Sequence, residues 1–580
     1  MAAATLFSLQ FHTDIADTQA LFFRGSAAVN ESGALVFGAG GTAAFDTYFN
    51  LFSHEKYAKY CGITSARLRL NGRGQFRVKL FRKAETGDEL LKSADFCDWF
   101  ELVFDFPAGG GFLWFSLEAP AGGELYSGAF EADIPAPNEV KLGVVICTYK
   151  REAFVARNME RVQKAISAAP EWADRLHFFI ADNAKTLNLP ESPLYTVIPN
   201  KNLGGSGGFT RGIVEVCGDA SFTHFLLMDD DISFEFATLE RTYHLLCALS
   251  PAHKSAAVGG AMLVLERPTE QYEFGARFTG LSLHSHNSRY DLADANSLLA
   301  NERVPAPNFL AWWYACMPVS FVQDYGLPMP FFIKGDDIEY GLRCVRDSIL
   351  LNGIGIWHQD FSSKYNYALE YYLKRNEQIL TAMHISHGRI KSCVRLLYAV
   401  FLQLALRRYD CAELILRAYE DFFRGSEYLN QIDAEALNAE IMAHKPEYED
   451  LKELEARCGV SAANAPTRRS EKKRPLSRAL ALFGAGYLPA LFCKKGAAAC
   501  DANETLTPKP MRCRTIVHCD SARGLGYACT LDTKRRAKIR RRAWKYFFKL
   551  LFGFGKFARD YRENRGRVCS GEEWNRRFGL

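Results

Sequence analysis

The sequence predicts an α/β domain that follows a β-sandwich and precedes a helical domain with a basic C-terminal region. Up to residue 138, short segments alternate polar and apolar side chains between glycine-rich turns, which is typical of a β-sandwich. Buried-strand patterns then alternate with helices, and from residue 364 the apolar spacing is helical. A chain of 580 residues exceeds one core, because single cores stop growing near ~250–300 residues. We therefore expect four regions, at 1–138, 139–363, 364–460 and 461–580.

Composition and charge narrow the class of protein. Hydrophobic content is 48% and charged content 24%, which excludes global disorder and a collagen-like fibre. The 16 cysteines have no repeating framework, which favours a reducing compartment over a secreted disulfide scaffold. The formal net charge is +5, but residues 466–580 hold 28 Lys and Arg against 9 Asp and Glu. An acidic body thus carries a basic end, which we expect to bind an anionic partner.

The apolar segments do not predict a signal peptide or a membrane span. The first residues lack a basic segment and a long apolar core. The longest uncharged apolar run, Ala479–Cys493, has 15 residues and contains two glycines and a proline. A span needs about 18 or more such residues, so this run is suited at most to a membrane interface. We expect the body of the protein to be cytoplasmic.

The two N-terminal domains are predicted from different strand patterns. Ser65–Leu70, Gln75–Phe81 and Trp99–Phe106 alternate with period two and give the β-sandwich. After a proline-containing linker at 135–138, continuous apolar runs such as Val144–Cys147 indicate strands that are buried on both faces. Polar residues follow these runs, and ligands of parallel sheets collect at the carboxyl ends of the strands. The sequence therefore predicts a ligand site there.

Three adjacent carboxylates, Asp229, Asp230 and Asp231, follow the apolar strand His224–Met228. Alternate residues of a strand face the same way, so Asp229 and Asp231 can point together while Asp230 turns aside. Two hard oxygen donors on one side suit Mg²⁺ or Mn²⁺ with phosphate oxygens. The alternative is a solvated acidic turn that caps the next helix. The position after a buried strand favours the metal site.

A glycine-rich segment, Pro199–Arg211, contains Gly204, Gly205, Gly207 and Gly208. Glycines let the backbone approach a ligand closely, and a helix start after them would offer free N–H groups to phosphate. The segment matches neither of the common phosphate-binding loop patterns. A flexible loop is the equally acceptable alternative.

Further candidates lie between residues 312 and 358. Asp336 and Asp337 stand where an apolar loop turns into a helix; one can cap that helix while the other acts as a general base, and plain capping is the alternative. His358 ends an apolar strand, where a histidine is either structural or a metal ligand. Trp312 and Trp313 are either core residues or flat surfaces for a sugar.

Together and in this order, these motifs resemble glycosyltransferase family 2, with its GT-A (Rossmann-like) fold. The strand Val144–Cys147, the glycine-rich segment and the three adjacent aspartates carry that resemblance. The β-sandwich, the Trp-Trp and Asp-Asp pairs and the Trp357-His358 pair narrow it to the polymerising galactofuranosyltransferases that build cell-envelope glycans. The resemblance covers roughly residues 10–400 and does not extend to the Cys-containing basic region after about residue 460.

The resemblance implies a role for each matched residue. Asp229, Asp231 and His358 would bind Mn²⁺ or Mg²⁺, and Asp337 would be the catalytic base, with Asp336 binding a sugar. The nucleotide sugar would be bound by Thr148, Arg151, Asp182, Asn202, Gly204, Gly205, Asp230, Trp312 and Trp313. The implied reaction is a single inverting displacement, in which galactofuranose moves from UDP-galactofuranose to a hydroxyl of a lipid-linked glycan acceptor.

The basic region predicts a membrane partner. In Lys534–Tyr561, cations are mixed with Trp544, Phe547, Phe548, Leu551 and Phe552 at helical spacing, which favours contact with an anionic lipid surface. Nucleic-acid binding and a solvated helix are the alternatives, and we expect no nucleic acid. The cysteines of the region are spaced too irregularly to predict a zinc site. We expect a peripheral protein on the inner face of the cell membrane, with a homo-oligomer left open.

Two rival functions stay open. One is a family 2 transferase with another donor, such as a rhamnose or glucose nucleotide. The other is a non-catalytic carbohydrate-binding scaffold led by the β-sandwich. The charge cluster at Asp229, Asp231, Asp337 and His358 argues against the scaffold, because a binding module has no use for it.

Overall fold

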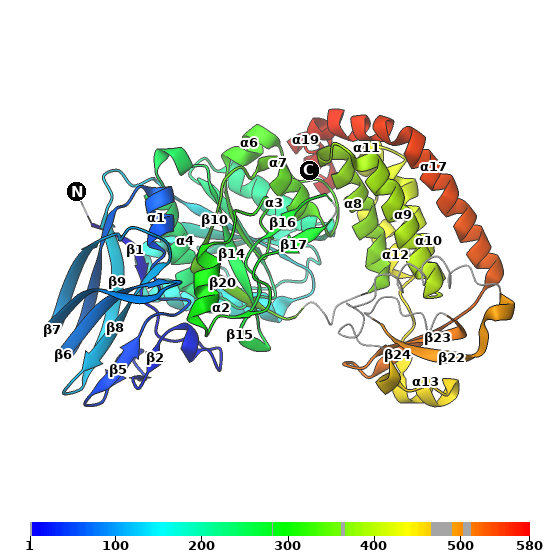
Figure 1. Ribbon diagram of the computed structural model, residues 1–580. Helices are drawn as coiled ribbons and strands as arrows, with labels where there is room; N and C mark the ends of the chain where they lie inside the picture. Colours follow the sequence, from blue (N-terminus) through cyan, green and yellow to red (C-terminus); the bar gives the residue numbers. More distant parts are fainter. Residues whose placement is uncertain (1–2, 281, 361–365, 466–489, 503–511) are drawn as a thin grey trace. The chain divides into compact units, whose positions relative to one another are not determined.

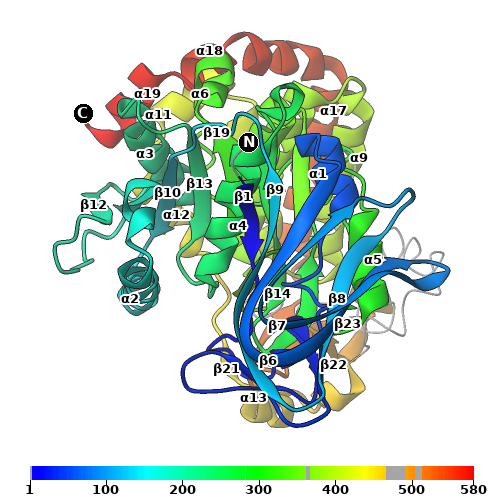
Figure 2. The ribbon, with the colours of Figure 1, turned by 90° about the vertical axis from the view of Figure 1, so that its left-hand side faces the viewer.

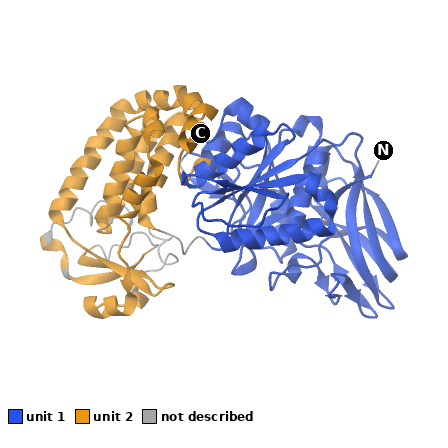
Figure 3. Ribbon diagram, turned by 180° about the vertical axis from the view of Figure 1, so that it is seen from behind, with its two compact units in different colours: residues 1–328, 337–360 blue, residues 329–336, 361–580 orange. Residues whose placement is uncertain are grey.

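The structure of the protein, a computed structural model, consists of two compact units (Figures 1 and 3). The structure describes residues 3–280, 282–360, 366–465, 490–502 and 512–580. Unit 1 contains residues 1–328 and 337–360, and unit 2 contains residues 329–336 and 361–580. Within each unit, the boundaries at residues 138 and 460 remain predictions.

Unit 1 begins with a nine-stranded antiparallel sheet, which is formed by the region predicted as a β-sandwich (Figure 2). Its long strand β6 (Ser65–Ala84) pairs with β7 along one edge and with β9 and β8 along the other, which joins all strands into one sheet. Along β6, Leu68, Leu70 and Val78 are buried while intervening polar residues face outward, as period two predicts. The other elements are β1 (Ala3–Ser8), β2 (Arg24–Gly25), β3 (Ala28–Val29), β4 (Leu35–Phe37), β5 (Gly41–Ala44), α1 (His54–Cys61), β7 (Gly87–Asp105), β8 (Phe112–Ala119) and β9 (Gly123–Asp133).

The second part of unit 1 is a mixed sheet flanked by helices, and it has the GT-A fold. Four parallel strands adjoin in the order β12 (Tyr195–Pro199), β11 (Leu176–Asp182), β10 (Leu142–Thr148) and β13 (His224–Asp229). The sheet continues through β19 (Tyr314–Pro318), β14 (Ala257–Val264), β15 (Arg267–Glu273) and β18 (Tyr290–Asp291), and β20 (Ser348–His358) pairs with β14. A small separate ladder joins β16 (Ala276–Phe278) and β17 (Leu283–Ser285). The central strands are buried on both faces, which explains their continuous apolar runs.

The helices of this part are α2 (Glu152–Ala168), α3 (Gly204–Gly218), α4 (Phe236–Ala248), α5 (Ala295–Glu302), α6 (Ser320–Tyr325) and α7 (Asp336–Cys344). The glycine-rich segment was predicted as a loop, but it forms the first turns of α3. A Cβ at Gly208 would lie 2.2 Å from Sγ of Cys147, and one at Gly212 would lie 2.1 Å from a methyl of Val145. These glycines therefore let α3 pack closely on β10, which periodicity could not reveal because glycine favours loops locally.

Unit 2 contains a helical bundle and a small sheet. The helices are α8 (Glu370–His384), α9 (Gly388–Ala405), α10 (Tyr409–Phe422), α11 (Ser426–Gln431), α12 (Ala434–Met442), α13 (Leu451–Cys458), α17 (Thr533–Glu563), α18 (Arg565–Val568) and α19 (Gly571–Phe578). The strands are β21 (Glu449–Asp450), β22 (Lys494–Asp501), β23 (Cys513–Asp520) and β24 (Leu525–Thr530). The sequence predicted no strands in the basic region after residue 460, but β22, β23 and β24 lie there. Val517 and Cys519 of this sheet pack against Leu454 of α13 and form a small core. The apolar segments that form it are short and flanked by basic residues, so the sequence pattern did not indicate them.

Helix α17 presents apolar residues on two faces. Ile539, Leu550 and Phe554 are buried on the side that packs against α8, α9 and α10. On the other side, Phe548 and Phe552 are exposed. Part of the predicted lipid-binding surface, at Phe548 and Phe552, thus lies on the exposed face of α17, while the opposite face packs in the helical bundle.

None of the helices described combines the length and hydropathy required to cross a bilayer. The apolar run predicted for a membrane interface, Ala479–Cys493, falls mostly outside the described residues.

Candidate active site

Polar residues from four strands meet at one edge of the mixed sheet. Thr148 ends β10 and pairs in register with Asp182 at the end of β11, while Cys147 pairs with Asp229 at the end of β13. Because β19 is antiparallel to both β13 and β14, β14 and its parallel partner β20 run in the same direction as β13. His358, which ends β20, therefore lies at the same edge. This is the edge where the sequence predicted a ligand site.

Asp229, Asp231 and His358 form a group that could hold a metal ion. One ligand atom from each residue lies within 4.8 Å of the others, and the group does not include Asp230. The strand β13 ends at Asp229, so the turn that follows it, and not strand alternation, places Asp231 in the group. Nδ1 of His358 lies 2.5 Å from the backbone oxygen of Gln359, which assigns its proton to that nitrogen. Nε2 then turns a lone pair toward Oδ1 of Asp231, 3.1 Å away. Two acceptors at this distance require a proton or a cation between them, so the donor set fits a metal.

The charges of this edge also fit a divalent cation. Burial raises the pKa of Asp229 well above its usual range, and the neighbouring charge of Asp231 raises it further. Burial likewise raises the pKa of Asp230 to about 6, against the lowering effects of the Thr148 hydroxyl and Arg151. Arg151 pairs with Asp231 and lies 3.7 Å from Asp230. Three carboxylates thus face one guanidinium, and the remaining charge matches an ion such as Mg²⁺ or Mn²⁺.

Asp182 and Asn202 hold backbone in the predicted nucleotide region. The carboxylate of Asp182 accepts N–H groups from Ala184 at 3.0 Å and Leu187 at 2.7 Å, which orders the loop after β11. Oδ1 of Asn202 accepts the N–H of Gly204 at 3.2 Å, where α3 begins. Both side chains therefore shape the backbone of the predicted donor site.

Helix α7 carries the two predicted catalytic carboxylates in its first turn. Gly335, with a φ of 84°, turns the chain into the helix, and Oδ1 of Asp337 accepts the N–H of Ile338 at 2.8 Å. Further along, the buried pair Glu339–Arg343 spans 2.8 Å, and Arg343 also donates to the backbone oxygens of Tyr325 and Leu327. These bonds fix the helix that presents Asp337. Asp336, the first residue of α7, is buried.

Glu273 is a further candidate, which the sequence motifs did not indicate. It is buried at the end of β15, where its carboxylate accepts the hydroxyl of Ser285. Burial raises the pKa of Glu273 to about 7, opposed by the Ser285 bond and assisted by the charge of Asp337. The only signal was the polar strand Glu270–Glu273, whose alternate residues Gln271 and Glu273 point inward despite being polar. The charge of Asp337 thus acts on Glu273, and the metal-binding group found among the described residues does not include Asp337.

The two tryptophans differ in their surroundings. Trp312 is buried and packs edge-on against Phe209 and Tyr340, with ring centroids 5.3 Å and 6.3 Å away. Trp313 is half-buried, and its Nε1 donates to the backbone oxygen of Gly260 at 3.1 Å. Core packing therefore accounts for Trp312, and Trp313 is the better placed of the two for a ligand.

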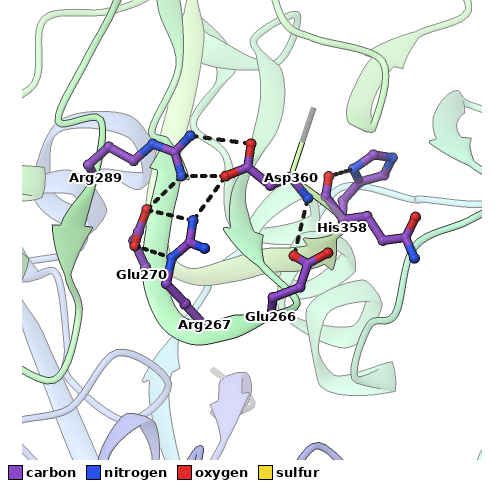
Figure 4. A network of polar contacts seen from close by, with 7 residues as sticks. Glu266, Arg267, Glu270, Arg289, His358 and Asp360 are labelled. Atoms are coloured by element: carbon purple, nitrogen blue, oxygen red, sulfur yellow. Dashed lines mark hydrogen bonds and ion pairs between the residues drawn. The ribbon is translucent and has the colours of Figure 1, made fainter. Parts of the chain in front are cut away.

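A charged network holds the chain immediately after His358 (Figure 4). Asp360 accepts hydrogen bonds from Arg267 and Arg289, each at 2.9 Å, and both arginines also pair with Glu270. The backbone N–H of Asp360 donates to Glu266 at 3.2 Å. Two residues upstream, His358 is thereby held at the end of β20.

Two family descriptions and two relatives match this chain. Residues 137–358 match "Glycosyltransferase like family 2", and residues 16–133 match "Galactofuranosyltransferase 2 N-terminal". The chain is 28% identical over 450 residues to galactofuranosyltransferase GlfT2 of Mycobacterium tuberculosis (strain ATCC 25618 / H37Rv), a match that covers 70% of this chain and 68% of the relative. It is 26% identical over 487 residues to galactofuranosyltransferase GlfT2 of Mycolicibacterium smegmatis (strain ATCC 700084 / mc(2)155), covering 77% and 73%.

Among solved structures, mannosyl-3-phosphoglycerate synthase from Rubrobacter xylanophilus is similar with a TM-score of 0.25 and 11% identity, over 41% of this chain and 73% of that one. The family and relative matches confirm the resemblance on which the sequence analysis relied.

Proposed function

Because the chain is a glycosyltransferase, we propose that it moves galactofuranose from UDP-galactofuranose to a hydroxyl of a glycan, with inversion at the anomeric carbon. The observation that carries the proposal is the group of Asp229, Asp231 and His358 at the strand ends of a GT-A sheet. Both relatives are named as galactofuranosyltransferases, and the matches to them cover most of this chain. They support galactofuranose as the sugar.

In this proposal, the donor diphosphate is bound at the acidic edge. Asp229, Asp231 and His358 would hold Mn²⁺ or Mg²⁺, which as a Lewis acid would offset the charge that builds on the departing diphosphate. Arg151, already paired with Asp231, adds a positive charge beside the same position. Asn202 and Gly204 at the start of α3 provide backbone order next to it.

Asp337 is the proposed base. The first turn of α7 orients its carboxylate through the N–H of Ile338. Burial raises the pKa of Glu273, and the charge of Asp337 raises it further. In the proposed reaction, Asp337 takes the proton of the incoming hydroxyl. One displacement follows, without a covalent intermediate.

An anionic membrane surface is the proposed location. Helix α9 exposes Ile390, Val394 and Tyr398, and α17 exposes Phe548 and Phe552. The two helices adjoin, with the rings of Phe401 and Trp544 6.2 Å apart. Exposed Arg and Lys side chains border these apolar residues on α17, at 541, 545, 549 and 556. Apolar side chains flanked by cations suit the interface of a membrane that carries a lipid-linked acceptor.

The test of the transfer is mass spectrometry of products formed by the purified protein from a synthetic lipid-linked acceptor. UDP-galactofuranose, UDP-glucose and a rhamnose nucleotide are compared at equal concentration with Mn²⁺. The proposal predicts extension by hexose units with UDP-galactofuranose alone. Preferred use of another nucleotide sugar would overturn the choice of donor.

Liposome flotation tests the location. Anionic vesicles should carry the wild-type protein, and Phe548→Asp with Phe552→Asp should release it. Equal flotation of the double variant would show that this surface is not the contact.

A further inference from the structure

A groove of about 660 Å³ lies on the outer face of the N-terminal sheet, apart from the residues assigned to transfer. Its walls come from β1, β6, β7 and β9 and from the segment that follows β1. The volume is within the ~300–1,000 Å³ of ordinary ligand sites. Nothing in the proposed transfer reaction uses these residues.

The register of three strands lines up polar and aromatic side chains in the groove. Asn71 of β6 pairs with Trp99 of β7 on one side and with Ser127 of β9 on the other. Arg69, two residues back on β6, faces the same way, because Leu70 between them is buried on the opposite face. The sheet thus offers a row of hydrogen-bonding groups beside an indole ring.

Two irregularities of β6 direct the aromatic rings outward. The register with β9 shifts after Asn71, so that Tyr126 has no paired position and stands in a bulge. The register with β7 also shifts after Asn71, next to Trp99. Trp99 and Tyr126 remain 57% and 43% exposed, although burial of such rings is favourable. Two bulges that hold aromatic rings in solvent beside polar groups indicate a binding surface.

The charges of the groove are matched to each other. Nη1 of Arg69 bonds both carboxylate oxygens of Glu131, at 3.0 Å and 3.3 Å, and the guanidinium lies 5.7 Å from the centre of the Trp99 ring. Only Nη1 takes part in this pair, so the other N–H groups of Arg69 are available to a ligand oxygen. A paired groove has little attraction for phosphate or another charged ligand.

We propose that this groove binds a neutral glycan, namely a segment of the chain that the active site extends. Sugars combine C–H faces, which stack on exposed aromatic rings, with hydroxyls that bond to Asn71 and Arg69. The identity of the glycan as a galactofuranose polymer rests on the proposed function. The general class, an uncharged oligosaccharide, rests on the groove alone.

The groove is connected to the catalytic part of the same unit. Its rim residue His12 is followed by Thr13, whose hydroxyl bonds Glu235, and by Asp14, which pairs with Arg161 at 3.4 Å. Glu235 lies four residues after Asp231 in the chain. A glycan bound in this groove would stay attached to the enzyme between transfers, because release would require it to dissociate from the groove and from the active site at the same time.

The experiment measures oligosaccharide binding directly. Isothermal titration with linear di-, tetra- and hexagalactofuranosides is performed on the Asp337→Ala protein, so that transfer does not interfere. In that background Trp99→Ala and Tyr126→Ala are each compared with Val103→Ala. Val103 is a matched control, since it lies on the same strand and face, is similarly exposed and is outside the groove. We expect hexasaccharide affinity to fall at least tenfold in the two aromatic variants and to stay unchanged in the control.

A second readout uses the otherwise wild-type enzyme. Trp99→Ala should leave the initial rate on a disaccharide acceptor unchanged and shorten the products by several sugar units. Hexasaccharide binding that is absent, or equal in Trp99→Ala and Val103→Ala, would overturn the groove. Failure of transfer from UDP-galactofuranose would overturn only the proposed function, because the titration needs no donor.

Discussion

The strand-end edge of the mixed sheet and the groove of the N-terminal sheet both gather polar side chains, but they treat charge in opposite ways. At the edge, two buried carboxylates and the half-buried Asp229 face one guanidinium, and desolvation raises the pKa of Asp229 and Asp230. In the groove, Arg69 and Glu131 are paired, and two aromatic rings are exposed. An excess of buried negative charge requires a cation and is typical of a catalytic site. An ion pair beside exposed aromatic rings is typical of a site that only binds a ligand.

The largest effect is expected from Asp337→Ala at the catalytic edge. Loss of a general base lowers kcat by about 10²–10⁴-fold, while binding of uridine diphosphate stays near wild type. Steady-state transfer and titration with the nucleotide measure the two quantities. Asp324→Ala is a suitable control, because Asp324 is an exposed carboxylate on the nearby helix α6. Full activity of Asp337→Ala would remove the assigned base.

Asp229→Ala should affect metal and donor binding together. The variant loses one of three proposed ligands, so the Mn²⁺ concentration at half-maximal activity should rise at least tenfold, with weaker donor binding. Activity measured across a Mn²⁺ series in both proteins decides this. An unchanged metal dependence would contradict the ligand assignment.

Glu273→Gln tests the buried carboxyl next to the base through pH. The pKa of Glu273 is raised from 4.5 to about 7, so its proton stabilises the fold below about pH 4.5, and this contribution is lost as the pH rises through 7. Between pH 5 and 8 the free energy of unfolding of the wild type should therefore fall more than that of the variant, by up to about 3 kcal/mol. Urea unfolding at both pH values measures it. Parallel pH profiles would mean that Glu273 is not protonated in the folded protein.

The smallest effect is expected in the groove. Glu131→Gln replaces a buried carboxylate by a neutral amide of the same shape and leaves Arg69, whose side chain is 43% exposed, able to bond water, so stability should change by only about 0–1 kcal/mol. Thermal unfolding measures the change. A loss of stability as large as that expected for an unpaired buried charge would contradict the difference between the two regions.

The sequence predicted those site residues that directly follow an apolar strand, and it did not predict those that only the fold brings together. Continuous apolar strands located Thr148, Asp182, Asp229 and His358 at strand ends, and a parallel sheet brings such ends together. Glu273 escaped notice because its partner Asp337 is distant in the chain and only the fold brings them together. The groove escaped because bulges, which period-two patterns do not reveal, direct Trp99 and Tyr126 outward.

Fold prediction failed where local preference opposed packing. Gly208 and Gly212 favour a loop in isolation, yet close contact with β10 places them in α3. Basic and small residues hid the strands β22, β23 and β24, which the apolar core around Val517 holds in place. In α17, exposed rings at 548 and 552 were found from spacing, but the buried face against the bundle was not.

The central claim is that Asp229, Asp231 and His358 bind one cation that holds the donor diphosphate. Anomalous diffraction from crystals grown with Mn²⁺ and uridine diphosphate tests it most directly. The account predicts a single strong peak within bonding distance of both carboxylates and of Nε2 of His358, with diphosphate oxygens completing its shell. A peak elsewhere, or bound nucleotide with no peak among these three residues, would contradict it.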